Sequence, residues 1–129
     1  MERSGIDMVV LAVLLAGLLP VVCAGIAKWG DRGYDNRNPR EWLAQQSGFR
    51  ARATAAQQNS FEAFPFFAAG VVFALLAGVE EAKVVSSAWF FLGMRVAYIY
   101  AYVTDRAALR SVVWALGYAT VIYLFALAI

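Results

Sequence analysis

The sequence predicts an all-α integral membrane protein, a single domain built as a bundle of four transmembrane helices. Hydrophobic residues make up 62% of the 129 residues, whereas soluble domains average roughly 45–50%. Four long runs carry almost no charge, and most Lys and Arg residues fall between these runs. A soluble domain of this length could not bury so much apolar surface, so part of its solvent must be lipid.

The first predicted helix covers about residues 6–29. Residues 8–27 are 20 residues without a charge, which is long enough to cross the roughly 30 Å hydrocarbon core of a bilayer. A cleaved signal peptide is the alternative. Its n-region, residues 1–7, is not basic, and the apolar run exceeds the ~7–15 residues of a signal sequence. A lipoprotein cleavage site before Cys23 is disfavoured because bulky Val22 precedes it.

The other three helices are predicted at about residues 50–79, 84–105 and 109–129. Residues 63–79 form the second uncharged run, and Glu80, Glu81 and Lys83 then make a polar turn. The third run is interrupted by Arg95, and the fourth continues uncharged to residue 129. Gly and Ala recur in all four, which suits close helix packing in lipid.

A loop at about residues 30–49 contains the signals of a short helix at about 39–47. Asn38 is a candidate N-cap, Pro39 takes the first helical position, Glu41 follows three residues after the cap, and Gly48 ends the helix. Trp42 in this helix favours a position on the bilayer interface. Two interpretations remain open, a solvated loop helix without a role and a lid over a site.

Basic residues predict the orientation of the bundle. Lys and Arg in short loops favour the cytoplasmic side, which places both termini outside and the long first loop in the cytoplasm. The residues on the predicted cytoplasmic side are Lys28, Arg32, Arg37, Arg40, Arg50, Arg52, Arg106 and Arg110, against Arg3 and Lys83 on the other.

Composition excludes several classes of function. A net charge of +2 gives no indication of a nucleic-acid partner, and the absence of His removes the commonest metal ligand and the usual general base. The single cysteine, Cys23, excludes an internal disulfide and a multi-cysteine metal site. We therefore expect no metal, and Cys23 is interpreted as a small apolar residue of the core.

Polar residues form a stripe on each of two otherwise apolar helices. At about 100° per residue, Arg52, Asn59 and Glu62 share one face of the second helix. The third helix carries the second stripe: Arg95, Tyr98, Tyr102 and Arg106. A charge within a membrane span costs roughly 2.5–3.5 kcal/mol and usually faces a bundle interior or cavity.

The simplest explanation is that Glu62 pairs with Arg95 and locks two helices together. Such a pair leaves the remaining Arg, Asn and Tyr residues of the stripes unexplained. This surplus of donors indicates a polar, anionic ligand that enters from the cytoplasmic side. A third possibility, a small transporter or proton pathway, needs polar residues across the midplane, and the first and fourth helices offer almost none.

Two motifs resemble those of a known family. "RATAAQQNSFEAFPFF", residues 52–67, resembles the second-helix motif of the MAPEG family, the membrane-associated proteins in eicosanoid and glutathione metabolism. "RVAYIYAYVTDRAALRS", residues 95–111, resembles the end of that family's third helix and the start of its fourth. The resemblance extends over nearly the whole chain and is to a bacterial branch similar to microsomal glutathione transferases, which implies the bacterial inner membrane.

The resemblance implies a homotrimer with glutathione bound in clefts between subunits. It implies that glutathione is a co-substrate and that a lipophilic electrophile or hydroperoxide reaches it from the membrane lipids. Arg52 and Arg95 would hold carboxylates, and Glu62 would accept from the γ-glutamyl ammonium. The other ligand-binding residues so implied are Gln57, Asn59, Tyr98 and Tyr102.

The catalytic residues that the resemblance implies lie at the start of the fourth helix. Arg110 would stabilise the thiolate, and Ser111 would donate to the sulfur. Matching this segment to some members needs a one-residue gap, so Arg106 and Arg110 both remain candidates for the catalytic arginine. Several members carry Arg where this chain has Ala55, and some carry His where it has Tyr98. A non-catalytic or accessory protein of this fold, binding a small anionic or lipid ligand, is therefore the alternative.

Overall fold

A computed structural model describes residues 3–129, and these residues contain five helices and no strand. The helices are α1 (Arg3–Lys28), α2 (Pro39–Ala44), α3 (Gly48–Leu76), α4 (Glu81–Val103) and α5 (Ala107–Ala128). Within this part of the chain, all four long helices are long and apolar enough to cross a membrane. The predicted four-helix membrane bundle is thereby confirmed.

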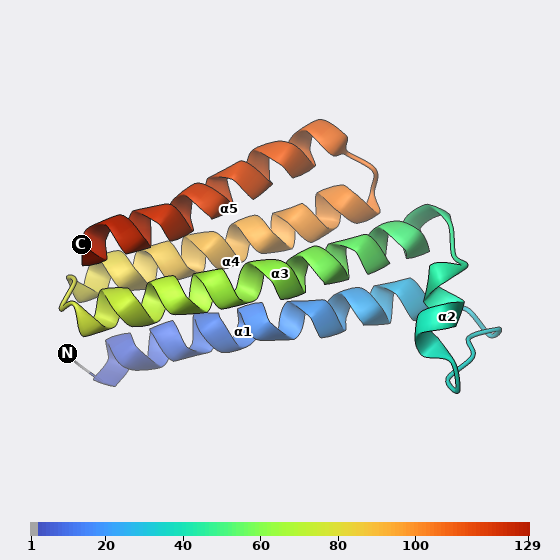
Figure 1. The fold of residues 1–129 in the computed structure, drawn as a ribbon, viewed down its shortest axis with the longest axis horizontal. Helices are drawn as coiled ribbons and strands as arrows, with labels where there is room; N and C mark the ends of the chain where they lie inside the picture. The colour runs from blue at the N-terminus through green and yellow to red at the C-terminus, as the bar shows by residue number, and fades with distance from the viewer. Residues whose placement is uncertain (1–2) are drawn as a thin grey trace.

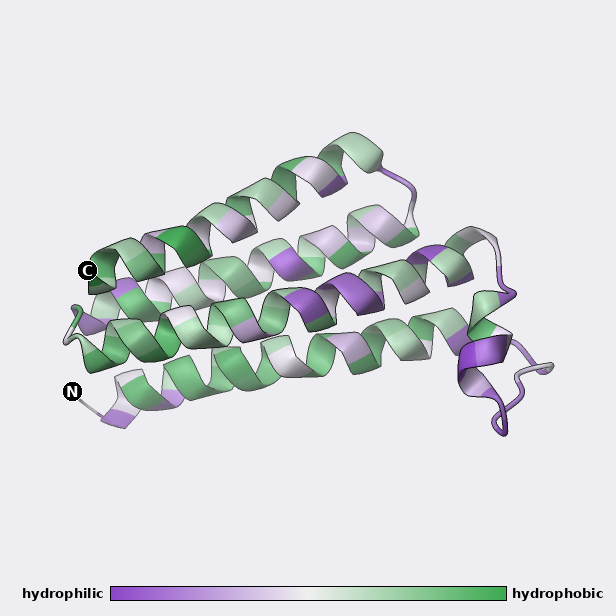
Figure 2. Cartoon of the chain, in the orientation of Figure 1, coloured by the Kyte–Doolittle hydropathy of each residue, from purple (hydrophilic) through white to green (hydrophobic). Residues whose placement is uncertain are grey.

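The four long helices lie side by side, with α3 and α4 in the middle (Figure 1). Helix α1 packs against α3 and α4, and α5 packs against the same two helices. The start of α1 and the end of α5 lie at one end of the bundle (Figure 1). Helix α2, its loop and the α4–α5 turn lie at the other end, which we call the loop end (Figure 1). Apolar residues dominate the long helices, whereas polar residues gather in the α2 region and in a middle stretch of α3 (Figure 2).

Small residues and stacked rings fill the core. Ala12 and Ala16 of α1 and Ala74 of α3 are almost completely buried, which lets the helix backbones approach closely. The rings of Phe67 in α3 and Phe91 in α4 stack with their centres 4.0 Å apart. Toward the loop end a second apolar cluster of buried residues contains Cys23, Ala56, Tyr98, Ile99 and Val113.

Observed helix ends differ from the predicted ones by a few residues. Helix α3 ends at Leu76 because Gly78, at φ 75°, forms a tight turn in which Val79 N–H donates to Ala74 O over 3.0 Å. Helix α1 already begins at Arg3, whose guanidinium pairs with Asp7 at 3.6 Å. The first two residues of the n-region discussed above lie outside the described residues.

The loop helix is shorter than the predicted 39–47 and ends at Ala44. Asn38 and Pro39 take the predicted first positions, but Asn38 makes no side-chain cap bond. Its amide donates instead to Asp35 Oδ2 over 3.1 Å. At the other end, the side chain of Gln46 donates to the carbonyl of Trp42 over 2.9 Å, while its backbone N–H donates to Leu43 O. The Trp42 carbonyl thus accepts from the Gln46 side chain instead of from the Gln46 backbone N–H. Gly48, predicted to stop this helix, begins α3.

Candidate functional site

Arg95 is the buried charge around which the site is built. It lies on the buried face of α4, one turn from Phe91 and Tyr98, and only 4% of it is exposed. Its Nη2 donates to Asn59 Oδ1 over 2.7 Å and to Ser60 Oγ over 3.4 Å. The guanidinium carbon lies 4.2 Å from the centre of the Tyr98 ring. These neutral groups of α3 and α4 accept some of the hydrogen bonds that the guanidinium can donate, and they leave its positive charge unpaired.

The ion pair between Glu62 and Arg95, considered above as the simplest explanation of the two charges, does not form in the described part of the chain. Among residues 3–129 the ion pairs are Arg3–Asp7, Arg50–Asp31 and Lys83–Glu80. Asn59 and Ser60 occupy the position nearest the guanidinium, while Glu62 lies nearly one turn further along α3 and is exposed. The pair therefore does not explain the two charges.

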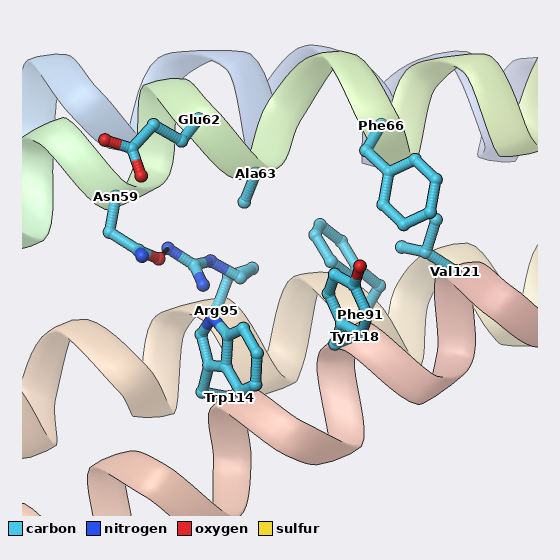
Figure 3. A pocket seen from close by; sticks show the side chains of 9 residues that line it. All are labelled: Asn59, Glu62, Ala63, Phe66, Phe91, Arg95, Trp114, Tyr118 and Val121. Carbon is cyan, nitrogen blue, oxygen red and sulfur yellow. Dashed lines mark hydrogen bonds between the residues drawn. The ribbon is translucent and has the colours of Figure 1, made fainter.

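A cavity of about 330 Å³ brings Arg95 and Glu62 together between α3, α4 and α5. In Figure 3, Asn59 and Glu62 project from α3 on one side, with the Asn59 amide directed toward Arg95. Phe91 lines the apolar part of the cavity, and the rings of Phe66, Trp114 and Tyr118 form a side of it that we call the aromatic wall (Figure 3). The cavity thus places a cation and a carboxylate beside an aromatic wall. It is lined by Asn59, Glu62, Ala63, Phe66, Phe91, Arg95, Trp114, Tyr118 and Val121.

The aromatic wall was not predicted as part of a site. The Trp114 and Tyr118 rings stack with their centres 5.1 Å apart, and the Phe66 ring lies 5.5 Å from that of Tyr118. The spacing of Trp114 and Tyr118 is the one sequence signal for this wall, because residues four apart on a helix share a face. That signal does not distinguish a ligand wall from lipid contact, since all three rings are also partly exposed.

A ladder of rings and guanidinium groups runs from the cavity to the loop end. From Arg95 and Tyr98 it continues to Tyr102, whose ring centre lies 5.6 Å from that of Tyr98. The Arg110 guanidinium lies 4.6 Å from the Tyr102 ring. The two candidate catalytic arginines therefore differ. Arg106 lies beyond the end of α4, directly before α5, and its guanidinium lies 5.8 Å from the ring of Tyr100, an exposed residue of α4. It does not continue the predicted stripe of Arg95, Tyr98 and Tyr102. Only Arg110 joins the ladder.

The remaining predicted site residues lie outside the cavity. Arg52 is at the loop end, where its Nε donates to the carbonyl of Val103 over 3.2 Å. Gln57 is half-buried on α3 and Ser111 is exposed on α5, and neither lines the cavity. In the predicted stripe, Asn59 and Glu62 therefore line the cavity while Arg52 does not. The seven residues from Arg52 to Asn59 correspond to about 10 Å along a helix.

A model of the MAPEG family matches residues 8–129. No curated protein and no solved structure matches the chain significantly. The family match extends over α1 from residue 8 onward, the other three long helices and both polar stripes. The chain therefore belongs to the MAPEG family, membrane proteins associated with eicosanoid and glutathione metabolism.

Proposed function

We propose that this protein is a membrane glutathione transferase or peroxidase. Glutathione carries two carboxylates, an ammonium and a thiol, so it needs cationic and anionic partners in one place. The single observation that supports the proposal best is the cavity that contains both Arg95 and Glu62 without pairing them. Arg95 is suited to a carboxylate, Glu62 to the γ-glutamyl ammonium, and Asn59 to a peptide amide.

In the proposed reaction Arg110 stabilises the glutathione thiolate at the loop-end side of the ladder. A nearby guanidinium lowers the pKa of the thiol, so that the proton passes to water and a nucleophile exists at neutral pH. The Arg110 guanidinium lies over the ring of Tyr102, in a cation–π contact. Ser111, one residue further along α5, is the proposed donor to the sulfur. The trimer and the intersubunit cleft implied by the resemblance belong to the same proposal.

Two reactions follow from such a thiolate. With an electrophile, the sulfur forms a bond to carbon while a leaving group departs with its electron pair. With a hydroperoxide, the sulfur takes the terminal oxygen, the O–O bond breaks, and the alkoxide is protonated to an alcohol. A second glutathione then converts the sulfenic acid to disulfide and water. The apolar substrate approaches from the bilayer, beside the aromatic wall that includes Trp114 and Tyr118.

The proposed setting is the bacterial inner membrane, with the loop end in the cytoplasm and both termini outside. The clustering of Lys and Arg at the loop end supports this orientation. Glutathione would then reach the site from the compartment where it is made, while the lipophilic partner reaches it from the membrane.

A non-catalytic, ligand-binding role is the second candidate. The observation that favours it is Arg52, a predicted carboxylate anchor that instead donates to the Val103 carbonyl, with Ala55 in the position where several family members carry Arg. A site with fewer anchors could hold glutathione, or another small anion, without orienting the sulfur for reaction.

The test is a glutathione titration of the purified protein in nanodiscs, followed by the ultraviolet absorbance of the thiolate. We expect saturable thiolate at neutral pH, its loss in Arg110→Ala, and its retention in Arg106→Ala. Calorimetry on the same samples reports binding independently of ionisation. Binding without thiolate in the unmodified protein favours the accessory role, and no binding at millimolar glutathione rejects the glutathione assignment.

A further inference from the structure

A second hollow, lined only by apolar residues and glycine, lies at the loop end of the bundle. Its volume is about 540 Å³, and we call it the loop-end groove. The last turns of α1, the residue that follows α1, the first turn of α3 and the last residue of α4 form it. It shares no lining residue with the cavity around Arg95. The lining residues are Val22, Gly25, Ile26, Trp29, Phe49 and Val103.

The groove is open because its floor has no side chain at Gly25. A Cβ atom built at Gly25 meets no heavy atom within 4 Å. The walls are also unpartnered, since Trp29 is 78% exposed and Val22 is 51% exposed. In a membrane this surface faces hydrocarbon near the helix ends, at the depth where a bilayer passes from acyl chains to headgroups.

Two arginines form the rim of the groove. Arg52 donates through Nε to the carbonyl of Val103, a lining residue, which holds the guanidinium at the edge. Arg50 donates through Nη1 to the carbonyl of Ala27 over 2.9 Å, and its guanidinium carbon lies 4.8 Å from the ring of Phe49. Asp31, 3.8 Å away, partly offsets the charge of Arg50. Arg52 has no such carboxylate among residues 3–129.

We propose that the loop-end groove binds one anionic phospholipid, with an acyl chain along the apolar floor at Gly25 and the phosphate at Arg52. The acyl chain matches a surface without polar side chains, and a basic pocket between helices at the membrane surface matches an anionic headgroup. Guanidinium groups bind phosphate through paired hydrogen bonds, and Arg52 keeps its terminal nitrogens free for them because Val103 uses Nε. The site does not depend on the proposed glutathione chemistry.

Native mass spectrometry tests this site by counting lipids retained on the protein. Purified protein in detergent is titrated with phosphatidylglycerol or with phosphatidylcholine of the same acyl chains. Each basic residue near a headgroup contributes enough to change affinity about fivefold. We therefore expect phosphatidylglycerol to bind at least about fivefold more tightly than phosphatidylcholine.

Variants separate the two parts of the site. Arg52→Gln should remove the preference for the anionic lipid, whereas Arg52→Lys should keep most of it. Gly25→Leu fills the floor and should weaken both lipids. Gly93→Leu is the matched control, because Gly93 is an exposed glycine of α4 that also has no heavy atom within 4 Å of a built Cβ. Circular dichroism of each variant confirms that the helices are retained.

Three outcomes overturn the proposal. The first is equal affinity for the two lipids, and the second is an unchanged preference in a folded Arg52→Gln variant. The third is that Gly25→Leu changes the mass of the protein oligomer while lipid retention stays the same, which would show that a second copy of the chain covers the groove. Glutathione binding by the same variants is measured separately, so that a loss of lipid binding can be told apart from a failure of the proposed function.

Discussion

The guanidinium of Arg95 and the side-chain amide of Asn59 join α4 to α3 through a 2.7 Å hydrogen bond inside the bundle. No carboxylate stands within ion-pair distance of Arg95 among residues 3–129. A charge in a membrane span is costly to insert. Its presence in an almost fully buried position is consistent with a site that keeps a cation available for an anionic ligand.

This relationship predicts opposite effects on stability and on binding. Asn59→Leu should lower the free energy of unfolding by about 1–3 kcal/mol, because it removes the closest acceptor of a buried cation. Combining it with Arg95→Met should restore most of that loss, since buried polar pairs are often replaceable by apolar residues. The double variant should nevertheless bind no glutathione.

Denaturant titration in micelles measures the stability, and calorimetry measures the binding. Gln58→Leu is the matched control, because Gln58 is an exposed neighbour on the same helix. If Asn59→Leu is as stable as the original protein, then another group compensates Arg95 and the argument for an available cation fails.

The contact between Arg110 and the face of Tyr102 predicts that the aromatic ring matters more than its hydroxyl. Tyr102→Leu should reduce the thiolate formed with glutathione, because it removes a cation–π contact of about 0.5–2 kcal/mol that positions Arg110. Tyr102→Phe should retain most of the signal. The measurement is thiolate absorbance at neutral pH.

Tyr100→Leu provides the control for this test. Its ring lies 5.8 Å from the Arg106 guanidinium on the exposed side of α4, so its loss should leave the thiolate unchanged. Should Tyr102→Phe be as weak as Tyr102→Leu, the hydroxyl itself would be the important group, as a donor to the ligand.

Sequence periodicity was sufficient for the four long helices and for three residues that line the cavity, Asn59, Glu62 and Arg95. Uncharged runs and helical spacing predict the bundle, and they place Asn59 and Glu62 on one face of α3, where both line the cavity with Arg95. Rotation about a helix axis is regular, so it can be read from spacing. Position along the axis is what separates Arg52 from Asn59 and Glu62 in the predicted stripe. Arg52 bonds to Val103 at the loop end and does not line the cavity.

The aromatic wall and the partners of Arg95 could not be predicted in the same way. Trp114 and Tyr118 look like lipid-facing residues until the packing of α5 against α3 brings them opposite Asn59 and Glu62. Arg95 bonds to Asn59 and Ser60, and not to Glu62, because of how far α3 and α4 are shifted along their axes relative to each other. This shift is set by tertiary packing, and sequence periodicity does not report it. For the same reason, only the three-dimensional structure separates Arg110 from Arg106.

Asp35 in the loop before α2 predicts a pH-dependent ordering of that loop. The Asn38 amide and the Arg37 backbone N–H both donate to its carboxylate, and these hydrogen bonds lower the pKa of Asp35 below its ordinary value. The lowered pKa means that the contribution to loop stability is present above about pH 4. It is lost as the pH falls through the lowered pKa.

Nuclear magnetic resonance titration of the Asp35 side chain checks this expectation. Asn38→Ala should raise the pKa of Asp35 toward its ordinary value of about 3.9, since the amide of Asn38 has the largest effect. Arg40→Ala changes a nearby exposed residue that makes no such bond, so it should leave the pKa of Asp35 where it is. An unshifted pKa in Asn38→Ala would show that the amide does not hold the carboxylate in solution.

The turn between α4 and α5 predicts a gain in stability from a single glycine. Asp105 has φ 60°, a left-handed conformation, and the backbone N–H of Arg106 donates to Ala101 O over 2.7 Å to close the turn. Most residues with a Cβ pay about 1–2 kcal/mol in this conformation. Asp105→Gly should therefore raise the free energy of unfolding by about 1 kcal/mol, and Asp105→Val should lower it.

Thermal unfolding in micelles measures both changes, with Thr104→Ala as a comparison that leaves the left-handed residue in place. The turn also sets where α5 begins, and hence where Arg110 lies relative to Tyr102. Asp105→Gly should consequently keep full thiolate formation, whereas Asp105→Val should lose thiolate in proportion to its disturbance of the turn. If Asp105→Val retains both stability and thiolate, the left-handed conformation is not required for the position of Arg110.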